Sequence, residues 1–178
     1  MIKGLTYLPE FISKEEEKNL IEFIDSQQWN TDLKRRTQHY GYKYDYTKKK
    51  IDKDSYVGKI PKEFDFIIEK LEFNPDQMIV NEYQPGQGIS RHTDCIPCFK
   101  ETIASLSLGS ICAMEFENKK GKKGSILLEP RSLLVLNGEV RYDWMHSIPA
   151  RKEDIWENET IIRERRISLT FRNVILSS

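Results

Sequence analysis

The sequence predicts an α+β protein that is mostly β, with two N-terminal helices packed outside a small sandwich or barrel. Two observations support this fold class. Apolar residues recur at helical spacing in two segments before residue 75, and from Met78 onward short strand-like runs alternate with turns. The chain has 178 residues, which is enough for a real hydrophobic core, and we expect one domain over residues 1–178.

Two N-terminal segments are expected to be helical. The first runs from about Ser13 to Gln27, where Ser13 and Glu16 form a capping box before an apolar stripe. A second helix is expected to begin at Pro61, because proline suits the first helical position. Residues 29–54, between them, are polar, basic and aromatic without a helical period. We expect this segment to be irregular or to form a pair of edge strands.

The β-rich part is expected to contain six main strands. They are predicted near residues 78–83, 103–108, 112–117, 125–128, 132–136 and 165–174. The sequences NKKGKKG and LNGE are predicted to be turns between them.

The last strand carries an unusual polar face. Side chains two apart on a strand share a face, so one face holds Ile167, Leu169 and Phe171 and the other holds Arg166, Ser168, Thr170 and Arg172. If the polar face meets water, it is an ordinary solvated face. If it faces a barrel interior, both arginines must meet anions, because a buried unpaired guanidinium is very costly.

Composition excludes few partners. Lysine plus arginine equals aspartate plus glutamate, 28 each, and we expect the lysine-rich run 119–123 to be solvated surface. There is no signal-peptide pattern and no apolar run of membrane-spanning length. Three cysteines would be unusual for a secreted disulfide scaffold. We therefore expect a soluble, intracellular monomer without a membrane partner.

Three histidines limit the possible metal sites. His92-x-Asp94 is weak on its own, but His146 follows the apolar run SLLVLN, from which a further barrel strand could return it to the same place. Two histidines and one carboxylate form the ligand set of non-haem Fe(II) oxygenases, which leaves three coordination positions open. Taken alone, His146 would be interpreted as a core histidine bonded to a backbone carbonyl.

The pair Cys95-x2-Cys98 allows several interpretations. It could bind Zn²⁺ together with His92 and Cys112, or form a redox pair. The zinc deaminase pattern is excluded, since it requires a glutamate where Asp94 stands. We favour two free thiols on a loop near the metal, without a required role.

Taken together, these motifs resemble the AlkB family of Fe(II)- and 2-oxoglutarate-dependent dioxygenases. The likeness covers roughly residues 30 to 174 and rests on Asn81-x-Tyr83, Gly86, His92-x-Asp94, His146 and Arg166-x5-Arg172. The segments RRTQHYGYKYDY, SLSLGS and RSLLVLNGEVRYDWMHSIPARK are most similar to the branch that includes the tRNA wobble-uridine hydroxylases. The resemblance implies a double-stranded β-helix, or jelly roll, with iron in its mouth.

The resemblance also implies residue roles. Fe(II) would be held by His92, Asp94 and His146. The co-substrate 2-oxoglutarate would be bound by Asn81, Tyr83, Arg166, Ser168 and Arg172, with Arg166 on its far carboxylate and Arg172 nearer the metal and the target base. Ser168 stands where many members have asparagine, so its contact requires a closer approach or a water. With O2 as second co-substrate, the enzyme would oxidise an alkylated or modified base in tRNA, or in alkylated DNA or RNA, by demethylation or stable hydroxylation.

Residues 34–60 are the candidate nucleotide-recognition lid. Its candidate substrate-binding residues are Arg35, Arg36, His39, Tyr40, Tyr42 and Tyr44, since arginines hold phosphates and aromatic rings stack on bases. The alternative is an amphipathic strand face with snorkelling lysines. Two other functions stay open: the same chemistry on a protein side chain or small molecule, or a non-catalytic metal-binding barrel.

Overall fold

The computed structural model describes residues 2–45, 47 and 49–177; Tyr46 and Lys48, in the predicted lid, lie outside the described residues. The strands are β1 (Leu5–Leu8), β2 (Thr37–Tyr42), β3 (Tyr56–Gly58), β4 (Gln77–Tyr83), β5 (Ile89–His92), β6 (Phe99–Gly109), β7 (Cys112–Asn118), β8 (Lys123–Leu128), β9 (Leu133–Leu136), β10 (Trp144–Ile148), β11 (Glu153–Trp156), β12 (Glu159–Ile162) and β13 (Arg166–Val174). The α-helices are α1 (Lys14–Ser26), α2 (Asp65–Ile68) and α3 (Gly138–Asp143), and 3-10 turns span Lys53–Ser55 and Lys62–Phe64.

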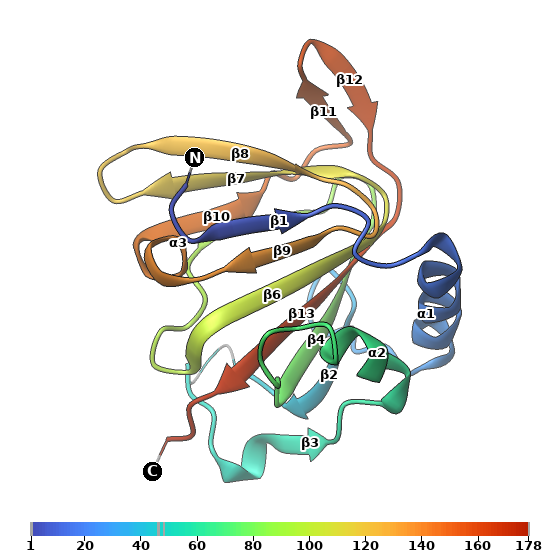
Figure 1. Cartoon of the computed structure of the whole chain (residues 1–178), viewed down its shortest axis with the longest axis vertical. Helices are drawn as coiled ribbons and strands as arrows, with labels where there is room; N and C mark the ends of the chain where they lie inside the picture. The colour runs from blue at the N-terminus through green and yellow to red at the C-terminus, as the bar shows by residue number, and fades with distance from the viewer. Residues whose placement is uncertain (1, 46, 48, 178) are drawn as a thin grey trace.

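Two antiparallel sheets form the body of the protein (Figure 1). The larger has the strand order β1-β9-β6-β13-β4-β2-β3, and the smaller has the order β5-β10-β7-β8. Side chains of both sheets meet in one apolar cluster, in which Ile103 and Leu134 of the larger sheet pack with Met114 and Phe116 of the smaller. The sheets therefore face each other, and β11 and β12 form a separate hairpin that projects from this body. The predicted mostly β jelly roll is confirmed.

Helix α1 covers the outer face of the larger sheet. The Ser13 side chain accepts a hydrogen bond from the Glu16 backbone and the Glu16 carboxylate accepts one from the Ser13 backbone, so the predicted capping box is present. Leu20 and Ile24 are buried against the apolar face of β4, β6 and β13. Among the described residues, no helix is both long and apolar enough to cross a membrane.

The second predicted helix is shorter than its pattern suggests. Pro61 precedes a single 3-10 turn, and α2 then spans only Asp65–Ile68. Phe64 and Ile67 are nevertheless buried in the core, so the inward face was predicted correctly. The predicted LNGE turn is wrong in type, because Gly138 begins the short helix α3.

All six predicted strands are present, with ends displaced by a few residues. The segment 29–54 contains β2, which lies inside the larger sheet between β4 and the edge strand β3. Strands β1, β3, β5 and the β11–β12 hairpin were not predicted. Each of these strands is three or four residues long, too short for a periodic pattern to stand out.

Alternation along two central strands determines what faces the space between the sheets. On β13, Ile167, Leu169 and Phe171 pack toward the helices, as predicted. The opposite face, which carries Arg166 and Arg172, is also buried. Because Arg166 is paired with Tyr83 and Ser168 with Asn81, the polar residues of β4 and β13 lie side by side on the inner face.

Candidate metal and co-substrate site

His92, Asp94 and His146 converge at one end of the space between the sheets. His92 ends β5 and is paired with His146 of β10, while Asp94 lies two residues beyond His92 in the following loop. Their potential ligand atoms all lie within 4.8 Å of one another. The Nε2 atoms of His92 and His146 are 3.4 and 3.7 Å from the same oxygen, Oδ1 of Asp94. Two imidazoles and a carboxylate at this spacing fit a 2-His-1-carboxylate Fe(II) site.

Neighbouring groups orient the ligand atoms. His92 Nδ1 lies 2.7 Å from the Ser90 carbonyl, which places the proton on Nδ1 and leaves Nε2 for a metal. Arg172 Nη1 donates to Asp94 Oδ2 at 3.0 Å, and its Nε donates to Gln77 Oε1 at 2.8 Å. Since Arg172 holds Oδ2, Asp94 presents only Oδ1 to the two histidines.

The ionised Asp94 carboxylate and the neutral His146 imidazole suit metal binding. Burial opposes ionisation of Asp94, but the charge of Arg172 and the hydrogen bond from His92 outweigh it and hold the pKa of the carboxyl well below its usual range. Burial lowers the pKa of His146 to about 4, so this imidazole is neutral. For His92, burial acts in the same direction, but the hydrogen bond and charge of Asp94 raise its pKa above the ordinary value.

Arg166 occupies the other end of the polar strand face. Its Nη2 donates to Ser107 Oγ at 2.8 Å, and its guanidinium carbon lies 5.6 Å from the centre of the Tyr83 ring. Within the described chain, its Nε and Nη1 are buried without a hydrogen-bond partner. A buried guanidinium with two unpaired donors requires an anion, and a carboxylate supplies a charge-assisted acceptor for it.

A cavity of about 730 Å³ joins Arg166 to the metal ligands. The predicted co-substrate residues all line it: Asn81, Tyr83, Arg166, Ser168 and Arg172. The Ser168 hydroxyl is 2.9 Å from the Ser105 hydroxyl, so the shorter side chain is held within a serine pair. A dicarboxylate that binds Arg166 at one end and a metal at the other fits this arrangement.

The sequence pattern of the 2OG-Fe(II) oxygenase superfamily matches residues 25–172. The chain belongs to this superfamily. The predicted class, a non-haem iron dioxygenase, and the predicted cofactor Fe(II) with 2-oxoglutarate and O2 as co-substrates are confirmed at this level.

Curated relatives of this 2OG-Fe(II) oxygenase include AlkB proteins, as the sequence motifs suggested. An Arabidopsis thaliana protein named alkylated DNA repair protein ALKBH8 homolog is 36% identical over 97% of this chain and 59% of its own length. A Macaca fascicularis protein named tRNA (carboxymethyluridine(34)-5-O)-methyltransferase ALKBH8 is 42% identical over 85% of this chain and 25% of its own length. The chain thus spans less than two thirds of both relatives.

Among solved structures, the protein OsALKBH1 has the same fold. The two superimpose with a TM-score of 0.72 over 96% of each chain, at 18% sequence identity. At this identity the likeness concerns the jelly roll alone.

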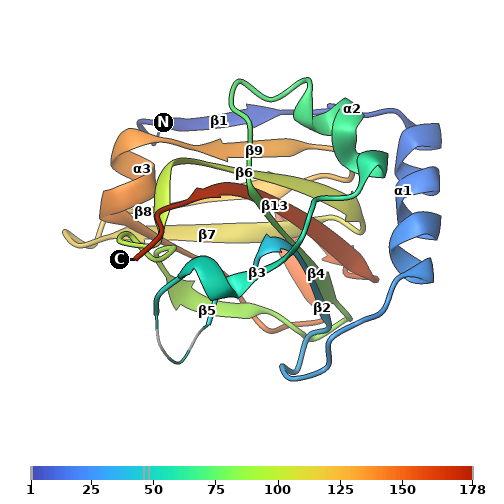
Figure 2. The ribbon, with the colours of Figure 1, turned by 90° about the horizontal axis from the view of Figure 1, so that it is seen from below.

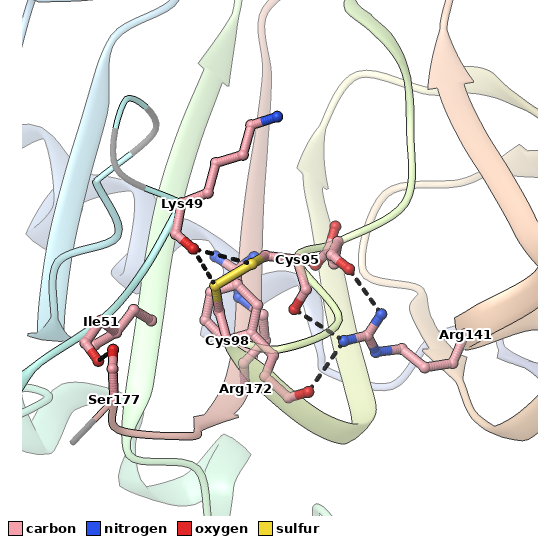
Figure 3. The surroundings of a disulfide bond; sticks show 9 residues. Lys49, Ile51, Cys95, Cys98, Arg141, Arg172 and Ser177 are labelled. Carbon is pink, nitrogen blue, oxygen red and sulfur yellow. Dashed lines mark hydrogen bonds and ion pairs between the residues drawn. A yellow bond between two sulfur atoms is a disulfide. The ribbon is translucent and has the colours of Figure 1, made fainter.

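The two cysteines beside Asp94 form a disulfide (Figure 3). A turn in which Cys98 N donates to the Cys95 carbonyl brings their Cα atoms to 5.2 Å, within the range that a disulfide bridges. The predicted pair of free thiols is therefore wrong. The zinc alternative fails with it, because neither sulfur is a thiolate and Cys112 is buried in β7 as a free cysteine.

Arg141 was not predicted as a site residue, although it supports the metal-ligand loop. Its side chain is only 2% exposed, and its guanidinium donates to the carbonyls of Asp94 at 2.9 Å and Phe99 at 3.1 Å, with longer bonds to Cys95 and Lys100 (Figure 3). It therefore holds together the loop on which Asp94 sits. No short motif marks such a residue, because its partners are backbone atoms about 40 positions away.

We expect Arg141→Lys to weaken metal binding. Lysine keeps the charge, but its single ammonium group cannot reach four carbonyls, so Asp94 would be less well positioned. The affinity for Fe(II), measured by titration under anaerobic conditions, should fall roughly tenfold, as for other groups that support a metal ligand. Arg131→Lys is the matched control, since Arg131 binds Glu17 on the outer surface. Equal metal affinities in the two variants would contradict this role.

The candidate lid residues separate into two groups. Arg35 and Tyr44 line the cavity together with Leu33 and Lys49. Arg35 Nε donates to Asn81 Oδ1 at 2.9 Å, so the lid contacts a predicted co-substrate residue directly. Tyr44 also packs against Phe99, at 5.7 Å between ring centres.

The other candidates are not among the residues that line the cavity. Tyr40 packs on Phe64 in the helix-side core, and Tyr42 packs on Tyr56 of β3. His39 has a buried Nδ1 without a partner among the described residues, and burial lowers its pKa to about 4. This histidine is therefore neutral, and it is unsuited to gripping a phosphate.

Arg36 has a structural partner. Its Nε and Nη2 each donate to the Glu82 carboxylate at 2.8 Å, and Arg165 Nε donates to the same carboxylate at 2.7 Å. These bonds lie on the helix side of β4, away from the cavity. The hydrogen bond from Arg36 makes the largest contribution to holding the pKa of Glu82 below its ordinary value of 4.5.

We expect Arg36→Ala to reduce stability. Losing this partly exposed pair should cost about 1–2 kcal/mol of unfolding free energy at neutral pH. A carboxyl whose pKa is lowered by folding stabilises the folded state above its unfolded pKa, and this stabilisation disappears as the pH falls through the folded pKa. The difference in unfolding free energy between Arg36→Ala and the parent protein, measured by urea unfolding, should therefore shrink below about pH 4.5. Arg35→Ala removes a bond to a neutral amide, so its effect on the unfolding free energy should not shrink at low pH. If the effect of Arg36→Ala were independent of pH, the Arg36–Glu82 ion pair would not be its cause.

Proposed function

We propose that this chain is an AlkB-type dioxygenase that oxidises a modified base in nucleic acid, with tRNA as the favoured substrate. One observation carries the proposal: a cavity that has the iron ligands at one end and the two unpaired donors of Arg166 at the other also reaches the basic, aromatic lid. We take residues 1–178 as one catalytic domain and residues 34–60 as its lid.

Each residue has a specific task in this function. Fe(II), when bound, couples the activation of O2 and the decarboxylation of 2-oxoglutarate to succinate with oxidation of a substrate C–H bond. His92, His146 and Asp94 Oδ1 hold the metal, and Arg172 keeps Asp94 ionised and oriented. Arg166 binds the far carboxylate. The buried strand faces around them keep water away from the reacting groups.

The lid supports a nucleotide as the substrate. Arg35 Nε donates to Asn81, and the guanidinium of Arg35 is a cation at the cavity, where an anionic backbone would pass. Lys49 also lines the cavity and adds a second positively charged residue. Tyr44 lines the same cavity and offers a ring for a base to stack on. The name of the Macaca relative refers to a tRNA uridine, and that of the Arabidopsis relative to alkylated DNA. Both relatives carry the ALKBH8 name, and the tRNA uridine in the name of the Macaca protein supports tRNA as the substrate to test first.

Substrate-stimulated succinate release tests this proposal. The protein, with Fe(II) and 2-oxoglutarate, is incubated separately with unfractionated tRNA, with methylated single-stranded DNA and with a peptide mixture. We expect tRNA to raise the rate above the substrate-free level. Stimulation by peptides alone would favour the protein-oxidising alternative, and succinate formation in no reaction would favour a non-catalytic barrel.

A further inference from the structure

Four lysines lie in the tight turn between β7 and β8 and at the first position of β8: Lys119, Lys120, Lys122 and Lys123. We call residues 119–123 the lysine turn. The Asn118 side chain accepts hydrogen bonds from the backbone of Lys120 at 3.0 Å and of Lys122 at 2.9 Å, and Gly121 adopts φ +77°. This turn requires an asparagine and a glycine at these two positions. The lysines are not needed to form it.

The lysine turn carries a concentrated positive charge that few acidic side chains neutralise. All four lysines are exposed. Within the described residues, the one acidic partner is Glu117, which lies 4.0 Å from Lys123 and is bound more closely by Arg91. Four ammonium groups within five residues repel one another, so the fold gains nothing from them. A bound polyanion would relieve this repulsion.

The lysine turn also lies close to the reaction centre. In the smaller sheet, Phe116 is paired with the metal ligand His146, and Asn118 is paired with Trp144. The turn therefore begins three strand positions beyond Phe116, about 10 Å further along the sheet. Figures 1 and 2 both place the β7–β8 turn at the end of the molecule opposite α1.

We propose that the lysine turn binds the phosphate backbone of the nucleic acid on the side of the cavity opposite the lid. This inference rests on the proposed function. The lid offers Arg35 and Lys49 from the larger sheet, and the lysine turn offers a second set of cations from the smaller sheet. A strand whose target base enters the cavity would have its flanking phosphates held from both sides. Flexible lysines suit this task, because backbone binding needs positive charge and no fixed geometry.

Binding of a fluorescent tRNA anticodon stem–loop tests the proposal. The probe is titrated with the Fe(II)- and 2-oxoglutarate-loaded protein at several salt concentrations. In the variant with all four lysines of the turn changed to glutamine, affinity at low salt should fall roughly ten- to hundredfold, and the slope of log affinity against log salt should decrease by about two to three units. Substrate-free succinate formation should be unchanged, since these side chains contact no site residue.

A matched pair of double variants separates local from overall charge. Lys119→Gln with Lys120→Gln removes two charges at the turn, and Lys14→Gln with Lys18→Gln removes two from the exposed face of α1. We expect only the first pair to weaken binding. If both pairs lowered the affinity for the tRNA probe equally, or if the fourfold variant bound it as well as the parent, the lysine turn would not be the phosphate-binding site. The proposed oxidation of a nucleic-acid base would be unaffected by either result. If the parent protein neither binds nor oxidises tRNA, both proposals fail together.

Discussion

Asp94→Ala should reduce 2-oxoglutarate turnover to the background of the assay. Asp94 supplies the one carboxylate among the three metal ligands, and its Oδ1 lies close to both histidine Nε2 atoms. Losing a group that merely supports a ligand costs roughly ten- to hundredfold, so losing the ligand itself should cost more than about a hundredfold. His92→Ala and His146→Ala should do the same. Succinate formation by the purified variants is the measurement.

Stability must be separated from catalysis in this experiment. Asp94→Ala also leaves the buried Arg172 guanidinium without its carboxylate, which is itself destabilising. Asp94→Asn keeps an oxygen for Arg172 but provides a weaker, neutral metal ligand. We therefore expect Asp94→Asn to fold better than Asp94→Ala and to remain inactive. Full activity in either variant would rule out the assigned ligand set.

Arg166→Lys should lower the affinity for 2-oxoglutarate by roughly ten- to hundredfold, since a bidentate charged pair is worth roughly 1.5–3 kcal/mol. Lysine keeps the charge but loses the planar guanidinium, whose Nε and Nη1 are buried without a partner among the described residues. The dissociation constant of 2-oxoglutarate, measured in the presence of Mn²⁺ and without O2, reports this loss of affinity directly.

Arg165→Lys is the matched control for this substitution. Arg165 is the adjacent residue, but it points to the opposite side of the sheet, where it binds Glu82 and Asp25. We expect its substitution to affect stability and to leave 2-oxoglutarate affinity unchanged. If Arg166→Lys bound 2-oxoglutarate as well as the parent, the unpaired donors would need another explanation.

Local patterns predicted the parts of this protein that local chemistry determines. The capping box at Ser13 and Glu16 located the start of α1, because both hydrogen bonds form within one helical turn. Alternation along residues 166–172 separated a core face from a polar face, since the strand period is independent of its neighbours. The combination of three metal ligands with Arg166 then indicated the family.

Features that depend on distant partners could not be predicted in this way. Arg35 and Arg36 are adjacent and chemically identical, yet one binds Asn81 at the cavity and the other binds Glu82 on the helix side. Only the pairing of β2 with β4 determines which of the two arginines reaches the cavity and which reaches the helix side. The importance of Arg141 likewise depends on the course of the 94–100 loop.

The central claim is that this cavity transfers oxygen from O2 to a base in nucleic acid. The most direct test is mass spectrometry of nucleosides from tRNA incubated with the protein, Fe(II), 2-oxoglutarate and isotopically labelled O2. We predict one labelled oxygen atom in succinate and, for stable hydroxylation, the other in an oxidised nucleoside. For demethylation, we predict loss of a methyl group with release of formaldehyde, whose oxygen exchanges with water. Asp94→Asn should form none of these products. Labelled succinate without any change in the nucleosides of tRNA, or of alkylated DNA tested in parallel, would contradict the account.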